Sequence, residues 1–133
     1  KKTNVIALEL PKGKIITGKQ TDLLSPASSV IINAIKELSK IPDEINLLSP
    51  TILEPILKLR KNNNTLSLQE VLIALAVCSV TNPSIASALE KLEVLKDCEA
   101  HATYIVTNGD LKALKSLKIN LTCEPNFYSK EIM

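Results

Sequence analysis

Aromatic side chains are scarce in this sequence: Tyr104, Phe127 and Tyr128 are the complete set, and there is no tryptophan. Proteins that bind single-stranded nucleic acid need aromatic rings on which bases stack. Lysine and arginine outnumber the acidic residues by only two, which is too small an excess for a surface that binds polyanions. We therefore expect no nucleic acid among the partners.

Glycine is equally scarce, with only Gly13, Gly18 and Gly109 in the chain. These positions form neither a Walker A loop nor a dinucleotide-binding fingerprint, and no serine lies between the glycines of a nucleophile elbow. Gly109 follows Thr107 at the start of a predicted helix, where open α/β sheets bind ligands, but Asp110 in the first turn would repel an anion. We expect a helix cap there, and no cofactor.

Long apolar runs and paired cysteines are also missing. The most apolar stretch, residues 71–80, has about half the length of a membrane span, so no membrane partner is expected. Cys78, Cys98 and Cys123, without a signal peptide, indicate free thiols in the reducing cytoplasm. A closed zinc site needs four ligands, and strand alternation would point Cys98 and His101 to opposite faces. We therefore expect no metal.

Local patterns indicate one α/β domain over residues 1–133. Residues 4–10 and 14–18 are rich in valine and isoleucine and flank a Pro-Lys-Gly turn, which predicts an N-terminal β-hairpin. Four helices are predicted from N-cap residues that precede proline or belong to a capping box. Their start signals are Ser25-Pro26, Ser49-Pro50, Ser67 with Glu70, and Asn82-Pro83.

Two of these helices carry further expectations. The first should keep Lys36 and Glu37 in water, because its apolar residues repeat on the other side. The third is apolar nearly all the way round, which predicts that it lies at the centre of the domain. Between them, residues 45–48 fit either a short strand or an apolar lead-in to a helix.

The last third of the chain predicts a strand-helix-strand unit. Residues 100–107 and 119–123 are strand-like, and residues 110–117 fit a short helix. The connection is long enough for a parallel crossover. The fold class is therefore α/β: a small mixed sheet with the N-terminal hairpin, about five helices and this C-terminal unit.

Strand alternation gathers polar side chains, including the only histidine, on one face of the two C-terminal strands. An imidazole beside carboxylates can do acid–base work or hold a ligand. The alternatives are a solvated sheet face and a structural hydrogen-bond network. The catalytic candidates are Glu99, His101 and Glu124, and the ligand-binding candidates are Thr103, Asn120 and Thr122.

Several strings resemble the C-terminal domain of a bacterial family known as domain of unknown function 1846, and the similarity spans nearly the whole chain. Two departures are visible, because that family usually has glycine where this chain has Asp97 and Lys118. The strings are Asn46-Leu47-Leu48-Ser49-Pro50, Leu53-Glu54-Pro55-Ile56, Glu70-Val71-Leu72-Ile73-Ala74-Leu75, Thr81-Asn82-Pro83, Cys98-Glu99-Ala100-His101 and Ile119-Asn120-Leu121-Thr122-Cys123-Glu124-Pro125.

The resemblance implies a larger cytoplasmic protein whose upstream region carries a glycine-rich, P-loop-like segment. It supplies no reaction and no catalytic role for any position. One hypothesis is that the domain and the upstream region together complete a nucleotide- or phosphate-dependent active site, with Glu99, His101, Thr122 and Glu124. The alternative is a structural or assembly module without catalytic residues. The expected partner is the upstream domain of the same polypeptide, and self-association stays open.

Overall fold

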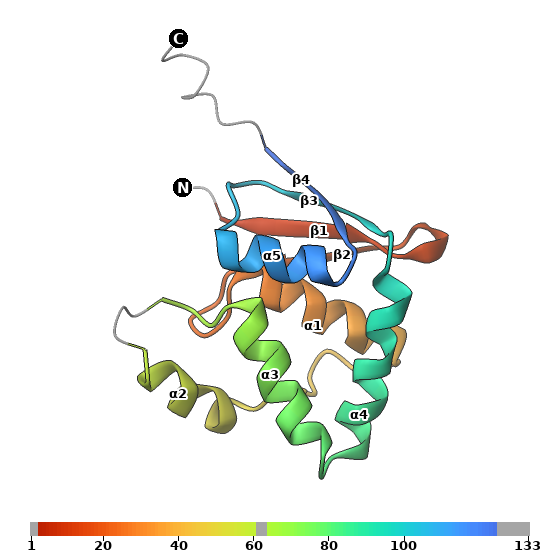
Figure 1. Ribbon diagram of the computed structural model, residues 1–133. Coiled ribbons are helices and arrows are strands. Elements are labelled where there is room, and N and C mark those ends of the chain that lie inside the picture. Colours follow the sequence, from red (N-terminus) through yellow and green to blue (C-terminus); the bar gives the residue numbers. More distant parts are fainter. Residues whose placement is uncertain (1–2, 61–63, 125–133) are drawn as a thin grey trace.

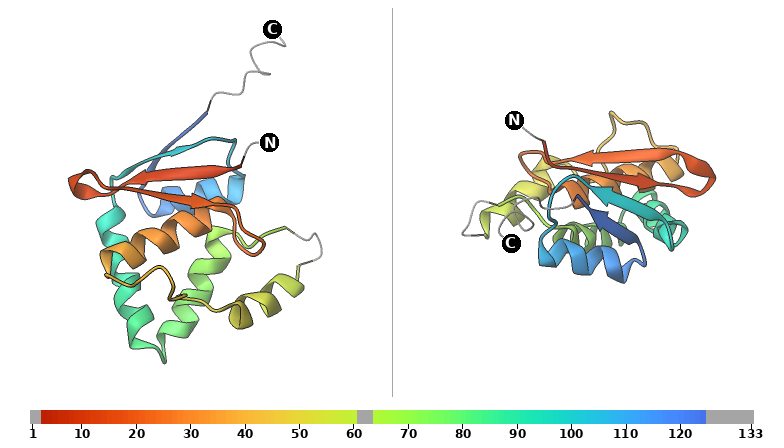
Figure 2. Two further views of the ribbon diagram at one scale, coloured as in Figure 1. Left: turned by 180° about the vertical axis from the view of Figure 1, so that it is seen from behind. Right: turned by 90° about the horizontal axis from the view of Figure 1, so that it is seen from above.

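The computed structural model describes residues 3–60 and 64–124. In this part of the chain, a four-stranded mixed sheet has the order β2-β1-β3-β4, and the helices lie on one of its faces (Figure 1). The other face is uncovered, as the view from above in Figure 2 also shows. The predicted α/β fold is confirmed, with one face of the sheet covered by helices and the other uncovered.

The N-terminal hairpin is formed as predicted. Strands β1 (Val5–Glu9) and β2 (Ile15–Lys19) pair in antiparallel register, and a single 3-10 turn, Pro11–Gly13, connects them. Gly13 has a φ of +94°, a conformation that glycine adopts without steric cost. Alternate residues such as Ile6 and Leu8 are buried beneath the helices.

Helix α1 (Pro26–Leu38) forms the centre of the core, with most of its apolar residues buried. Ser25 caps it by accepting a hydrogen bond from the backbone N–H of Ser28 at 3.2 Å. The helix lies directly on β2, because a Cβ atom at Gly18 would overlap the backbone of Val30. This contact fixes α1 against the edge strand of the sheet.

The expectation that Lys36 stays in water is wrong. Its exposed fraction is 5%, whereas Glu37 is exposed and pairs with Lys14 at 2.7 Å. The segment that follows α1 folds back over the last turn of the helix and covers Lys36. Residues 45–48 belong to this segment and form no strand, although Leu47 and Leu48 are buried.

The expectation of a central third helix is also wrong. Helix α3 (Leu68–Ser79) packs against α1, α4 (Pro83–Glu90) and α5 (Asn108–Ser116), on the side away from the sheet. Its capping box is present as predicted, but Ile73 and Val77 are 57% and 66% exposed. A uniformly apolar helix gives no periodic signal for the side that will be covered. Helix α2 (Pro50–Lys58) lies on the side of α3 opposite to α4 (Figure 1).

The C-terminal unit is parallel, as predicted. Strand β3 (Glu99–Ala102) follows a short 3-10 helix, Lys91–Leu95, and pairs with β1 in antiparallel register. Helix α5 then leads to β4 (Asn120–Cys123), which runs parallel to β3. The strand predicted over residues 100–107 ends at Ala102 instead, because the chain bends at residues 103–104, after the backbone N–H of Thr103 has donated to the carbonyl of Val5, the first residue of β1.

The contact at Gly18 gives a direct test of this packing. Gly18→Ala should lower the free energy of unfolding by about 2 kcal/mol or more, because the backbone of Val30 must move. Gly109→Ala is the matched control: nothing lies within 4 Å of its Cβ position, and alanine should stabilise α5 by up to about 1 kcal/mol. Urea denaturation measures both, and an unchanged stability of Gly18→Ala would contradict the contact.

Candidate functional site

His101 lies at the centre of a polar network on the uncovered face of the sheet. Because β3 and β4 are parallel, His101 stands directly beside Thr122 in the register. Its Nδ1 atom is 2.8 Å from Thr122 Oγ1, and its Nε2 atom is 2.9 Å from Glu124 Oε1. Both ring nitrogens are therefore engaged within the domain.

The hydrogen-bond partners fix the role of one ring nitrogen of this imidazole and leave two possible roles for the other. An ionised Glu124 only accepts hydrogen bonds, so Nε2–H must be the donor to it. The hydroxyl of Thr122 donates to the carbonyl of Ala100 at 3.4 Å, and in that arrangement Nδ1–H donates to Thr122. If the Thr122 hydroxyl donates to Nδ1 instead, an imidazole with one proton, on Nε2, makes the same two contacts, so both ring nitrogens are occupied in either arrangement.

The other candidate residues share the face but are not joined to His101. Asn120 donates through Nδ2 to Glu99 Oε2 at 3.1 Å. Thr103 Oγ1 accepts from the backbone N–H of Val5 at 3.1 Å and donates to the Val5 carbonyl at 3.3 Å. The six candidates thus form three separate groups: His101 with Thr122 and Glu124, Glu99 with Asn120, and Thr103 alone. Thr103 connects the start of β1 to the end of β3.

The network is a surface feature. The side chains of His101 and Glu124 are 49% and 47% exposed, so water screens the interaction between them. A pair of this kind contributes between zero and about 1 kcal/mol to stability. In the described part of the chain, no group of three or more His, Cys, Asp or Glu side chains is placed to hold a metal ion.

The three cysteines are free and differ in exposure. Cys98 is buried on the helix-covered side of the sheet, opposite His101, and its thiol donates to the Val94 carbonyl at 3.6 Å. Burial, followed by the charge of Asp97, raises the pKa of the Cys98 thiol. Cys123 is exposed. The buried thiol behaves as a small apolar group.

The start of α5 is a helix cap whose carboxylate also joins two helices. Thr107 Oγ1 accepts from the backbone N–H of Asp110 at 3.4 Å. The buried Asp110 carboxylate accepts from the backbone N–H of Leu68, at the start of α3, at 2.8 Å. Burial, followed by the charge of Asp110, raises the pKa of the nearby Tyr104. One carboxylate thus stabilises two helix N-termini, which the sequence analysis did not anticipate.

Sequence reasoning also missed a polar stripe on α1. Ser29, Asn33 and Lys36 repeat at intervals of four and three residues, which places them along one side of the helix. Ser29 and Lys36 are both buried. The signal was present, since polar residues at helical spacing in an otherwise apolar helix mark a face with its own role.

Comparison with known proteins places this domain in a family. The family model described as "Domain of unknown function DUF1846, C-terminal" matches residues 1–133. The chain belongs to this family. Its DUF1846 relatives include UPF0371 proteins of Clostridioides difficile (strain 630), Clostridium botulinum (strain Eklund 17B) and Clostridium tetani (strain Massachusetts), which are 46%, 48% and 42% identical to it.

The matched region is a small part of each relative. It covers 96% of this chain and 26% of each of these three UPF0371 proteins, so the chain spans about a quarter of their length. The resemblance to DUF1846 found in the sequence is therefore confirmed. Among the helices described, none has the length and apolar character needed to cross a membrane.

The two departures from the usual DUF1846 glycines fall at positions where glycine would be favoured. Asp97 and Lys118 have φ angles of +69° and +65°, in the left-handed region. The backbone N–H of Asp97 donates to the carbonyl of Lys118 at 2.7 Å, so the two turns meet just before β3 and β4. Each side chain carries a steric cost that glycine would not have.

Replacing either residue with glycine should stabilise the domain. Asp97→Gly and Lys118→Gly should each raise the free energy of unfolding by about 0.5–1 kcal/mol, after the greater freedom of glycine in the unfolded chain is subtracted. Lys96→Gly is the control, because Lys96 has an ordinary φ of −58° and should lose stability. A loss at all three positions in urea denaturation would contradict the left-handed assignment.

Proposed function

We propose that this domain is an assembly module, and that the uncovered face of its sheet binds the upstream region of the longer protein. The observation that carries the proposal is the one-sided covering of the sheet (Figure 2). All four strands expose alternate side chains on that face, and no described helix packs there. A face of this extent offers a ready surface for a second domain.

The composition of the face supports the same proposal. Apolar side chains of the hairpin, Val5, Ala7 and the 55% exposed Ile15, share it with the polar network of β3 and β4. Apolar side chains beside hydrogen-bonded polar groups are typical of the interfaces between domains and between proteins. The His101 network would contribute polar contacts and orientation there.

The length of the relatives indicates which segment would cover the sheet face. About three quarters of each UPF0371 relative lies outside the region that matches this chain, which is ample for further domains. A contact within one polypeptide also forms at high effective concentration, so it does not need a strongly apolar surface. The upstream region is therefore the partner that we propose for the sheet.

The second candidate is a nucleotide- or phosphate-dependent active site that Glu99, His101 and Glu124 complete with the upstream region. Its support is the meeting of an imidazole and a carboxylate at 2.9 Å, a pair with acid–base potential. It is less well supported than the assembly role, because both nitrogens of His101 are already engaged. The His101 cluster also lies on an open surface, without walls that would exclude water.

A pair of substitutions tests the assembly role. Ile15→Asp places a charge on the open sheet face, and Ile73→Asp places one on α3 at nearly the same exposure, 55% against 57%. In the full-length protein, Ile15→Asp should lower the free energy of unfolding by about 2 kcal/mol more than in the 133-residue chain, because the charge becomes buried in the contact. Ile73→Asp should cost the same in both proteins. Thermal and urea unfolding provide the measurements.

His101→Ala separates the two candidates. In the 133-residue chain the substitution should lower the free energy of unfolding by no more than about 1 kcal/mol, because the contact between His101 and Glu124 is exposed. In the full-length protein, an assembly role predicts a larger loss of stability. If His101→Ala abolished turnover or nucleotide binding while leaving full-length stability unchanged, and Ile15→Asp showed no extra cost, the active-site candidate would replace the assembly role.

A further inference from the structure

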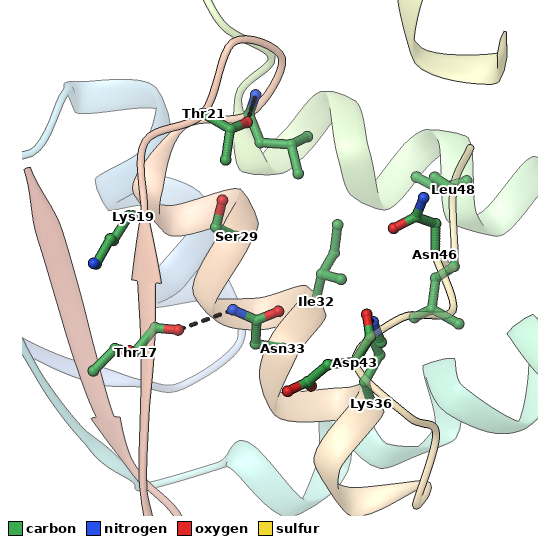
Figure 3. A pocket seen from close by; sticks show the side chains of 12 residues that line it. Thr17, Lys19, Thr21, Ser29, Ile32, Asn33, Lys36, Asp43, Asn46 and Leu48 are labelled. Carbon is green, nitrogen blue, oxygen red and sulfur yellow. Dashed lines mark hydrogen bonds between the residues drawn. The ribbon is translucent and has the colours of Figure 1, made fainter. Parts of the chain in front are cut away.

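A cavity of about 370 Å³ lies between α1, the edge strand β2 and the segment that follows α1. Figure 3 shows Ser29, Ile32, Asn33 and Lys36 projecting from the helix on one side, with Asn46 and Leu48 on the other. Its volume is within the range of small-molecule sites. The cavity is separate from the uncovered sheet face, so ligand binding there would not depend on the assembly role.

Lys36 is the most unusual residue of this cavity. Only 5% of it is exposed, and its Nζ atom donates to the Asp43 carbonyl at 3.0 Å. Among residues 3–60 and 64–124, none of the ion pairs includes Lys36, so no carboxylate of these residues lies within 4.0 Å of Nζ. An ammonium group has three donors, and two of them have no hydrogen-bond acceptor among the described residues. A buried charge without a counter-ion is costly.

Ser29 supplies a second unsatisfied donor in the same cavity. Its exposed fraction is 7%, and its buried Oγ atom has no hydrogen-bond partner among the described residues. Two helical turns separate it from Lys36, and both residues line the cavity. Buried hydroxyls are normally hydrogen-bonded, so an isolated one points to an acceptor supplied from outside the chain.

The other residues that line the cavity indicate which further properties a ligand would need. Asn33 uses Nδ2 to donate to the Thr17 carbonyl at 2.9 Å, which fixes its side chain at the cavity (Figure 3). Lys36 supplies the positive charge of the cavity, because the Lys19 side chain points away from it, on the other side of β2 (Figure 3). Asp43 also lines the cavity, but among the described ion pairs its carboxylate is not within 4.0 Å of Lys36 Nζ and does not neutralise it. Apolar surface is added by Ile32, Leu47 and Leu48.

We propose that this cavity binds a small organic anion, whose carboxylate or phosphate group accepts a hydrogen bond from Lys36 Nζ while another oxygen of the same ligand accepts one from Ser29 Oγ. Such a ligand supplies both the missing counter-charge and the missing acceptors, which a neutral ligand does not. The apolar wall accommodates a short carbon skeleton. Carboxylates and phosphates share this recognition chemistry, and binding measurements distinguish them.

The test is a titration of the ¹⁵N-labelled 133-residue chain, followed by NMR, with acetate, pyruvate, methyl phosphate and inorganic phosphate as probes and chloride as the control. We expect saturable shifts confined to α1 and residues 43–48 with at least one probe, and none with chloride. Saturation by the carboxylates alone or by the phosphates alone identifies the source of the oxyanion. Shifts that do not saturate, or that spread over the exposed lysines, would show an adventitious ion only and would overturn the proposal.

Three variants complete the test. Lys36→Met should weaken binding at least tenfold, whereas Lys58→Met, an exposed lysine of α2, should change it less than twofold. Without ligand, Lys36→Met should fold at least as stably as the original chain, because it removes an unpaired buried charge. Ser29→Ala removes one hydroxyl and should weaken binding at least threefold, which keeps the test decisive if Lys36→Met fails to fold. Unchanged affinity in Ser29→Ala and in folded Lys36→Met would contradict the proposal.

Discussion

The close contact between Gly18 and Val30 determines the arrangement of this domain. Because β2 carries no side chain at that point, α1 lies directly on the edge strand and buries most of its length against the hairpin. Helices α3 and α5 then pack on each other and α3 packs on α1, with the Asp110 carboxylate between the N-termini of α3 and α5. All of the described helices are thereby held on one side, and the opposite face of the sheet is left without cover.

That asymmetry produces two polar regions of different kinds. On the uncovered face, hydrogen bonds satisfy both nitrogens of His101, which suits a contact surface better than a reaction centre. On the covered side, Lys36 and Ser29 are buried with donors that the described residues do not satisfy. A satisfied polar group has little to gain from a ligand, whereas an unsatisfied buried group has much to gain. A ligand is therefore expected at the buried polar residues of α1 and not at His101.

Local rules predicted the features that depend on neighbouring residues along the chain. The hairpin, the parallel C-terminal unit and the helix caps follow from turn, cap and spacing signals, and alternation put His101, Thr122 and Glu124 on one face. The errors arose where distant segments decide the outcome. Lys36 is buried because a later loop covers it, β3 ends where its partner β1 begins, and the periodicity of α3 did not show which side would be exposed. The role of Asp110 requires two helices to meet, which no local pattern reports.

In the longer protein, we propose, the uncovered sheet face becomes a buried contact. Carbodiimide labelling of carboxylates, read by mass spectrometry, tests it most directly when the 133-residue chain and the full-length protein are compared. Glu99 and Glu124 report on the sheet face, and the exposed Glu54 and Glu90 report on helices α2 and α4. If the sheet face is buried there, Glu99 and Glu124 will be protected several-fold in the full-length protein while Glu54 and Glu90 react equally in both. Equal labelling of all four carboxylates in the two proteins would contradict it.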